Sequence, residues 1–301
     1  MKKLTAKYHL TEKETKALEG TFVDHSHYDQ IINFDCDCYS ETGKPLFFFR
    51  KKYIPEETLY NAYTSMKKAA SKSDNRGIAS GGERKFHITS DGKQTKTSRT
   101  FVPGTNELLK VNSGIAGYFD RSAHFDYCRT TAFNKQHLDK FQKAMPLIEE
   151  VDRGFRELVP SRYKKQKGMI KATHPNYRIG ETAFTTITIN KDYRTAVHTD
   201  AGDYPDGFGN LVAYCKDIEP ALFVLPRFRI AIDMRTCDLL LVDVHQHHGN
   251  TEIIKKTKDA VRLSFVMYYR ENMWKCGSPS EELKRHQLNQ RRVAMEYSGL
   301  I

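Results

Sequence analysis

The carboxyl-terminal half of the chain is dominated by short apolar runs that turn residues separate. Residues 183–189 alternate in polarity and are rich in β-branched side chains, which is typical of a strand with one buried face. Similar runs follow at intervals of roughly 8–15 residues, at 211–214, 221–225, 230–232, 239–244 and 261–269. Many short strands at such spacing predict a β-sandwich or a jelly roll.

Helical patterns lie mostly in the first half of the chain. Residues 133–158 carry apolar side chains at helical spacing, and Pro160 is expected to end that helix. Residues 55–71 also favour a helix, residues 1–50 a small strand pair, and residues 280–292 a basic helix. Helices followed by strands predict an α+β protein with a mainly β core. We expect a double-stranded β-helix, or cupin-like jelly roll, buttressed by N-terminal helices.

Three regions are expected along the chain. Residues 1–110 form an N-terminal region packed on the core, residues 111–275 form the double-stranded β-helix, and residues 276–301 form a basic helix and tail. Residues 71–99 are rich in Ser, Gly, Thr and basic side chains, without apolar periodicity. They predict either a mobile surface loop or a basic arm that a phosphate backbone would order.

Composition narrows the class of protein. The 301 residues are 39% hydrophobic and 28% charged, as in a chain that folds. We find no apolar run near the roughly 20 residues that span a membrane, and no signal peptide, so a soluble, intracellular, non-secreted protein is expected. The six cysteines lack paired Cys-x-x-Cys spacing, so we expect reduced thiols and no cysteine zinc site. The net charge of +11 fits either a solvated surface or binding to a polyanion.

A His-x-Asp motif at His198 and Asp200 is the first candidate for chemistry. On a strand, residues two apart face the same side, and this pair opens a loop rich in Gly and Asp. His124 and Asp126 form a second His-x-Asp without such a loop, which we interpret as a chance occurrence. Two imidazoles and one carboxylate typically bind one face of a non-haem Fe(II) ion and leave the other positions open.

The second imidazole has three candidates, His245, His247 and His248, which follow the predicted strand 239–244. By alternation, His248 lies on the side of the two valines of that strand, and the other two histidines lie on the opposite side. His248 is therefore favoured if the valines face the core, and the other two stay open.

An arginine begins the apolar strand that follows. A guanidinium in the wall of a barrel needs an anionic partner, because an unpaired buried charge is costly. For Arg262 a dicarboxylate would supply bidentate geometry. The alternative is an edge arginine that pairs with a surface acid.

Taken in order, residues 185–190, 194–200, 248–252 and 262–270 resemble the TET/JBP family. Its members are Fe(II)- and 2-oxoglutarate-dependent dioxygenases that oxidise the 5-methyl group of pyrimidine bases in DNA. The likeness extends over about residues 110–275 and implies Fe(II), 2-oxoglutarate and O2. It implies a minimal catalytic module, because the cysteine-rich zinc-binding part of animal TET proteins is missing. By residue match, the iron ligands would be His198, Asp200 and His248, and the contacts to 2-oxoglutarate Arg262, Ser264 and, less directly, Arg129.

The resemblance also places Asp203, Tyr268 and Arg270 where TET enzymes contact the base. An ionised Asp203 would accept a hydrogen bond from the amino group of cytosine but could not donate one to O4 of thymine. This favours oxidation of 5-methylcytosine to 5-hydroxymethylcytosine, possibly further. The alternative is thymine to 5-hydroxymethyluracil, since Arg270 stands where TET enzymes have a histidine.

DNA with a flipped base is the expected partner, with phosphate contacts from residues 71–99 and 282–292. Neither a membrane nor a protein partner is expected. Two other functions stay open. One is a dioxygenase with a non-DNA substrate, and the other is a basic β-sandwich that binds DNA without catalysis.

Overall fold

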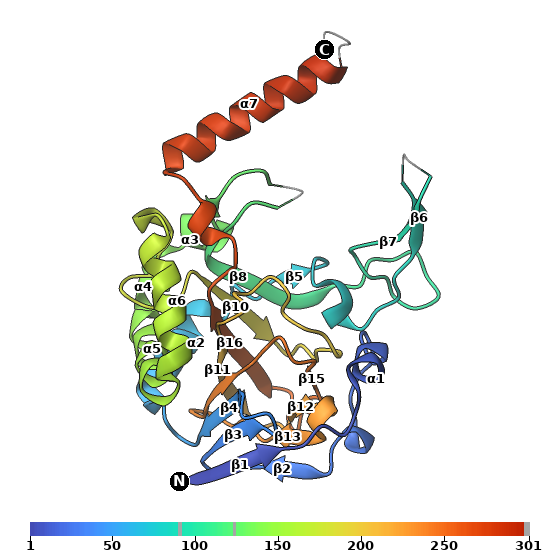
Figure 1. Cartoon of the computed structure of the whole chain (residues 1–301), viewed down its shortest axis with the longest axis vertical. Coiled ribbons are helices and arrows are strands. Elements are labelled where there is room, and N and C mark those ends of the chain that lie inside the picture. The colour runs from blue at the N-terminus through green and yellow to red at the C-terminus, as the bar shows by residue number, and fades with distance from the viewer. Residues whose placement is uncertain (90–91, 123–124, 298–301) are drawn as a thin grey trace.

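Two β-sheets lie face to face in the computed structural model, which describes residues 1–89, 92–122 and 125–297 (Figure 1). The smaller sheet has four strands, in the order β15 (Gly249–Asn250), β12 (Phe223–Leu225), β13 (Ile230–Ile232) and β2 (Gln30–Ile32). The larger has ten, in the order β1 (Lys2–Ala6), β3 (Cys36–Ser40), β4 (Pro45–Arg50), β14 (Leu239–Val242), β11 (Gly209–Lys216), β16 (Val261–Tyr268), β10 (Thr186–Lys191), β8 (Val111–Phe119) and β5 (Lys72–Ser73), with β9 (Arg129–Thr130) beside β8.

Strand alternation divides the core into two layers. On β4, Phe47 and Phe49 join the cluster between the two sheets, which includes Phe223 of β12. Phe48, between them, joins the cluster on the other face of the large sheet, together with Phe155 of a covering helix. Both faces of the large sheet are therefore buried, and the predicted α+β jelly roll is confirmed.

Helices cover the outer face of the large sheet: α2 (Glu56–Met66), α3 (Ala132–Gln136), α4 (Leu138–Lys143), α5 (Met145–Leu158) and α6 (Pro160–Ala172). The single helix predicted at 133–158 is therefore three helices. Pro146 in the first turn of α5 has no N–H and cannot continue α4. The predicted helical region ends before Pro160 as expected, since α5 ends at Leu158, but Pro160 itself begins a further helix, α6, which the pattern missed because its buried positions are few.

The N-terminal strands are not a separate pair. β3 pairs with β1 in parallel and with β4 in antiparallel orientation, β4 pairs with β14, and β2 pairs with β13 of the smaller sheet. A short unpredicted helix, α1 (Glu12–Ala17), begins at a capping box of Thr11 and Glu14. The first 50 residues thus supply strands to both sheets.

The segment 71–99, expected to be a loop, contains regular elements. β5 pairs with β8, and β6 (Phe86–Ile88) forms a hairpin with β7 (Gln94–Lys96) whose residues 90–91 lie outside the description. The hairpin strands bury little surface and so have no apolar alternation in the sequence. Short 3-10 helices lie at His25–His27, Gly77–Ser80, Pro175–Tyr177, Pro226–Phe228 and Met273–Lys275.

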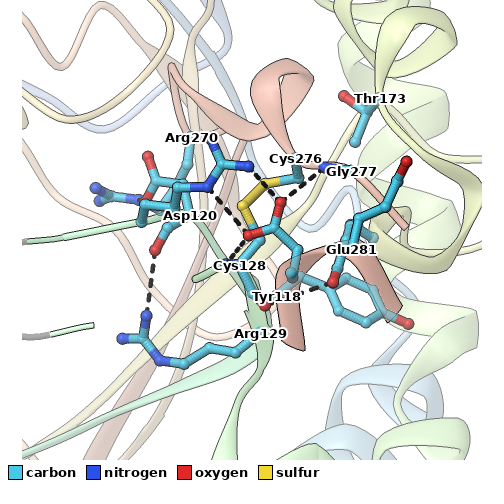
Figure 2. Close-up of a disulfide and its surroundings, with 12 residues drawn as sticks. Tyr118, Asp120, Cys128, Arg129, Thr173, Arg270, Cys276, Gly277 and Glu281 are labelled. Atoms are coloured by element: carbon cyan, nitrogen blue, oxygen red, sulfur yellow. Dashed lines mark hydrogen bonds and ion pairs between the residues drawn. A yellow bond between two sulfur atoms is a disulfide. The ribbon is translucent and has the colours of Figure 1, made fainter. Parts of the chain in front are cut away.

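The C-terminal helix, α7 (Pro279–Tyr297), projects from the same end of the molecule as the β6–β7 hairpin (Figure 1). Just before it, Cys276 forms a disulfide with Cys128, which is 148 residues away in sequence (Figure 2). The expectation that all cysteines are reduced is therefore wrong for this pair, because the fold brings their Cα atoms to 5.8 Å. Among the described helices, we find none with the length and apolar character to cross a membrane.

Candidate metal centre and its pocket

A cavity of about 470 Å³ opens between the two sheets. Its walls include Thr188 of β10 and Val266 of β16 from the large sheet, and Phe223 of β12 from the small sheet. Along β16, alternation directs Arg262, Ser264, Val266 and Tyr268 into this cavity, while the residues between them pack against the helices. The cavity is within the usual size range of small-molecule sites.

Three metal-binding groups meet in this cavity. His198, Asp200 and His248 each offer one ligand atom, and these atoms lie within 4.8 Å of one another. Nε2 of His198 is 3.6 Å from one carboxylate oxygen of Asp200, and Nε2 of His248 is 3.8 Å from the other. This donor set fits a divalent metal, since two imidazoles and a carboxylate converge on one point.

Backbone contacts hold the two imidazoles in place. His198 and His248 form an isolated antiparallel bridge, in which each N–H donates to the carbonyl of the other at 3.0 and 2.9 Å. Nδ1 of His198 is 2.8 Å from the carbonyl of Ala196, and Nδ1 of His248 is 2.9 Å from that of Gln246. When both Nδ1 atoms donate, each Nε2 is left with its lone pair facing Asp200.

The structure distinguishes between the three clustered histidines. His248 is only 5% exposed, and burial, with the nearby His198, lowers its pKa to about 4, which keeps it neutral for metal binding. His247 instead contacts Glu19 through Nε2 at 3.0 Å, and His245 lies beside Asp243. Val244, before the cluster, lies in the core, as the preference for His248 required.

The second His-x-Asp motif lies away from this centre. His124 is outside the described residues. The carboxylate of Asp126 accepts hydrogen bonds from His286 at 2.7 Å and from Asn289 at 2.5 Å, both on α7. Asp126 therefore has a structural role in holding that helix.

Arg262 is 4% exposed and lines the cavity beside Ser264. Its Nε is buried and makes no hydrogen bond in the described part of the chain, where its side chain also has no ion pair. The alternative of an edge arginine that pairs with a surface acid is therefore wrong. Burial lowers the pKa of this guanidinium, which leaves it in need of an anionic ligand.

Two polar residues of this cavity were missed in the sequence. Tyr193 buries its hydroxyl, and Arg76 buries its Nε, and among the described residues neither atom has a partner. Tyr193 lies five residues before His198, and Arg76 lies in the segment expected to be a loop. Apart from these positions, nothing in the sequence indicated either residue, because the burial of a polar atom depends on distant parts of the chain.

The three residues expected to contact a base also line the cavity. Tyr268 contacts the Thr188 hydroxyl at 3.1 Å, and burial raises its pKa to about 12. Burial, with Asp200 nearby, raises the pKa of Asp203 well above its ordinary value of 3.8. A raised pKa favours the protonated carboxyl, which can donate as well as accept, so Asp203 by itself does not separate cytosine from thymine.

Two arginines meet at the wall of the cavity. Nε of Arg270 donates to Oδ1 of Asp120 at 2.7 Å, and Arg129 donates to the backbone carbonyl of Asp120 at 3.2 Å (Figure 2). The guanidinium of Arg129 lies 3.9 Å from the ring centre of Phe125 and 5.0 Å from that of Phe119. Arg129 thus belongs to the cavity, next to the disulfide at Cys128.

Comparison with known proteins gives a family and a fold. The Tet_JBP family, described as the oxygenase domain of the 2OGFeDO superfamily, matches residues 114–271. The chain is 31% identical to bifunctional helicase and thymine dioxygenase JBP2 of Leishmania braziliensis over 195 residues, which are 64% of this chain and 17% of the relative. It is 34% identical to thymine dioxygenase JBP1 of Trypanosoma brucei brucei over 166 residues, which are 54% of this chain and 19% of the relative.

The chain therefore spans less than a fifth of the length of these relatives. Among solved structures, that of NgTET1 in complex with 5mC DNA matches with a TM-score of 0.55 at 11% identity. The match covers 92% of this chain and 99% of that one, and supports the shared fold.

Proposed function

Because the chain belongs to the Tet_JBP family of 2OGFeDO-superfamily oxygenases, we propose that it hydroxylates the 5-methyl group of a pyrimidine base in DNA. Members of this superfamily use Fe(II), 2-oxoglutarate and O2. The observation that carries the proposal is the meeting of His198, Asp200 and His248 in one cavity with the unpaired Arg262. A non-catalytic DNA-binding sandwich would have no need of this arrangement.

Within the cavity, His198, Asp200 and His248 would hold the metal, and Arg262 with Ser264 would receive the distal carboxylate of 2-oxoglutarate. When bound, Fe(II) with 2-oxoglutarate supplies the oxidation of the C–H bond by O2. The buried guanidinium would bind that carboxylate and so orient the co-substrate. Arg129 and Tyr193 line the same space and are our further candidates for co-substrate contacts.

On the substrate side, we assign Asp203, Tyr268 and Arg270 to the base. All three line the cavity, and Tyr268 and Asp203 are at most 7% exposed. A cavity between two sheets cannot admit a duplex, so the base must leave the stack to reach it. The hairpin β6–β7 and its flanks carry Arg84, Lys85, Lys96 and Arg99, which we propose as contacts to the phosphate backbone.

The base that this assignment favours is thymine. The relatives at 31% and 34% identity are named thymine dioxygenases, whereas the match to a 5mC DNA complex reflects fold similarity alone. Discrimination in favour of 5-methylcytosine would require an ionised Asp203, and burial, with Asp200 nearby, raises the pKa of this carboxyl. 5-Methylcytosine therefore becomes the second outcome of the same assay.

The test uses two duplexes with Fe(II) and 2-oxoglutarate, followed by mass spectrometry of the nucleosides. One duplex contains thymine and no methylated cytosine, and the other contains 5-methylcytosine with uracil in place of thymine. We expect 5-hydroxymethyluracil from the first, and none from the His198→Ala/Asp200→Ala variant. Product from the second duplex alone would move the assignment to 5-methylcytosine. Succinate release with neither product would refute a DNA base as the substrate.

A further inference from the structure

One face of α7 is anchored to the wall of the cavity. Its first buried position is Glu282, whose side chain is 2% exposed and forms an ion pair with Arg121. The same carboxylate accepts hydrogen bonds from the backbone N–H groups of Cys128 and Gly277, both at 2.8 Å. This carboxylate thus joins the start of α7 to the segment 119–129.

The next positions on this face continue the contact. His286 and Asn289, four and seven residues after Glu282, both bind the carboxylate of Asp126. The ring of His286 also lies 4.5 Å from that of Tyr127. Positions 282, 286 and 289 lie one above another on the helix, so a single face of α7 docks on the segment 119–129.

A covalent bond completes the anchor. Cys276, three residues before α7, is bonded to Cys128, and Arg129 follows directly (Figure 2). The segment 119–129 supplies Phe125 and Arg129 to the cavity wall. The root of α7 and the mouth of the cavity therefore form one connected unit, and the direction of the helix is set relative to the cavity.

A basic and exposed face of α7 begins opposite the anchored face and extends round one side of the helix. At 100° per residue, Lys284, Arg285, Leu288 and Arg291 fall within an arc of about 120°. In the described part of the chain the three basic side chains have no ion pair, and Leu288 is 63% exposed. We name these four residues the basic face. It covers about 10 Å of helix axis, roughly three nucleotide steps along one DNA strand.

We propose that the basic face of α7 binds the phosphate backbone of duplex DNA beside the base that enters the cavity. The proposal rests on the proposed function, which supplies the polyanion. The anchors at Glu282 and Cys276 hold one face of α7 against the protein. Lys284 and Arg291 lie about 160–180° around the helix from Glu282 and point away from the protein, where a duplex can reach them. The β6–β7 hairpin projects from the same end of the molecule, so a duplex at this end can meet both (Figure 1).

The test removes two charges from the basic face and measures duplex affinity by fluorescence anisotropy at several salt concentrations. Each lost phosphate contact lowers the slope of log K against log salt by about 0.9. For Lys284→Gln/Arg291→Gln we therefore expect a slope smaller by about 1.8, and an affinity at least about tenfold lower at 0.1 M salt. The matched control is Lys3→Gln/Lys44→Gln, which removes the same charge from exposed positions on β1 and directly before β4.

The outcomes separate this proposal from the proposed function. If the unaltered protein forms no modified nucleoside, the proposed function fails, whatever α7 binds. If the unaltered protein does form product, but the α7 variant binds DNA with the same affinity and salt slope as the control variant, the proposed DNA-binding role of α7 is wrong and the proposed function stands. Vesicles of phosphatidylserine and phosphatidylcholine form the third arm. Loss of vesicle binding in the α7 variant, with unchanged DNA affinity, would assign the face to an anionic membrane surface and overturn the proposal.

Discussion

Single side chains in the cavity differ from buried polar residues elsewhere in the fold. Arg262 buries a guanidinium nitrogen that has no partner among the described residues. Arg50, which is also buried, donates to the carboxylate of Asp37 at 2.6 Å and to the carbonyls of Cys36 and Phe49, both at 2.9 Å. A buried charge without a partner is costly, so residues such as Arg262 mark the place where a ligand completes the structure.

This contrast predicts the effect of removing the guanidinium. Arg262→Gln should weaken 2-oxoglutarate binding by about 100-fold or more, since losing one partner of a buried ion pair costs roughly 3–5 kcal/mol. Calorimetry with a redox-inert divalent metal measures this. Arg50→Gln is the matched control, which should lower the free energy of unfolding but leave 2-oxoglutarate affinity unchanged. Equal 2-oxoglutarate affinity in Arg262→Gln and the unaltered protein would disprove the assignment.

The choice among the three histidines is tested in the same way. His248→Ala should lower the affinity for Co(II) by more than about 100-fold, because loss of an outer partner alone typically costs 10- to 100-fold. His247→Ala removes a neighbouring imidazole that contacts Glu19, and should retain the metal site. Optical titration with Co(II) reports binding without turnover. If His247→Ala lost the metal and His248→Ala kept it, the ligand set would be wrong.

At the scale of elements, polar contacts hold α7 on the segment 119–129. Two carboxylates, Glu282 and Asp126, make these contacts. Burial by itself favours the protonated form of each, but hydrogen bonds from their partners prevail and lower both pKa values below the ordinary 4.5 and 3.8. The docking of α7 is therefore strongest when both groups are ionised.

A pH dependence follows from these shifts. A carboxylate with a lowered pKa in the folded state adds stability above its unfolded pKa, and that stability disappears as the pH falls through the folded value. We expect the docking of α7 to weaken as the pH falls below these ordinary pKa values toward the lower folded ones, and the single tryptophan, Trp274, at its root to report this by fluorescence. Glu282→Gln, which leaves Arg121 and Tyr177 without the charge they face, should weaken docking already at neutral pH.

The matched control for this titration is Glu281→Gln. Glu281 accepts from the backbone of Ser278 and, among the described residues, has no hydrogen bond or ion pair to the segment 119–129. Its fluorescence titration should follow that of the unaltered protein. A flat titration of the unaltered protein down to pH 3 would show that the two carboxylates do not hold α7.

At the scale of the whole molecule, the fold extends beyond the region that matches the family. The matched residues 114–271 contain β10, β11, β14 and β16, but β14 pairs on its free side with β4 from the first 50 residues. Through this pairing Phe47 and Phe49 enter the core between the sheets, and Phe48 enters the core beneath the helices. Each buried phenylalanine contributes about 1.5–3 kcal/mol.

A fragment of residues 111–275 should therefore fail to fold on its own. It would expose the edge of β14 and lose three buried phenylalanine side chains. The lost burial free energy is comparable with the whole free energy of unfolding of a typical domain, about 5–15 kcal/mol. Thermal unfolding followed by circular dichroism should show no cooperative transition. Residues 1–277 are the matched control, because they lack α7 but keep both sheets and should unfold cooperatively. A cooperative transition in 111–275 would make the N-terminal strands accessory.

Local periodicity predicts which side chains on one strand face the same way, whereas the roles of Ser264 and Tyr268 were expected from the family resemblance. Arg262, Ser264 and Tyr268 share one face of β16 because side chains alternate along any strand. His198 and Asp200 lie beyond the end of β10, in an extended segment and not on a regular strand. Side chains two residues apart still face the same side there, so the two ligands lie together. Such relations involve neighbours in the sequence, so they can be read without knowing the fold.

Other features depended on contacts between distant parts of the chain. His248, which alternation and the family resemblance already favoured, reaches the metal centre through its bridge to His198, and Cys128 meets Cys276 only because two loops lie together. The raised pKa of Asp203 reflects how deeply the assembled sheets bury it. Burial, dielectric environment and long-range pairing are properties of the assembled core, so only the tertiary structure could decide them.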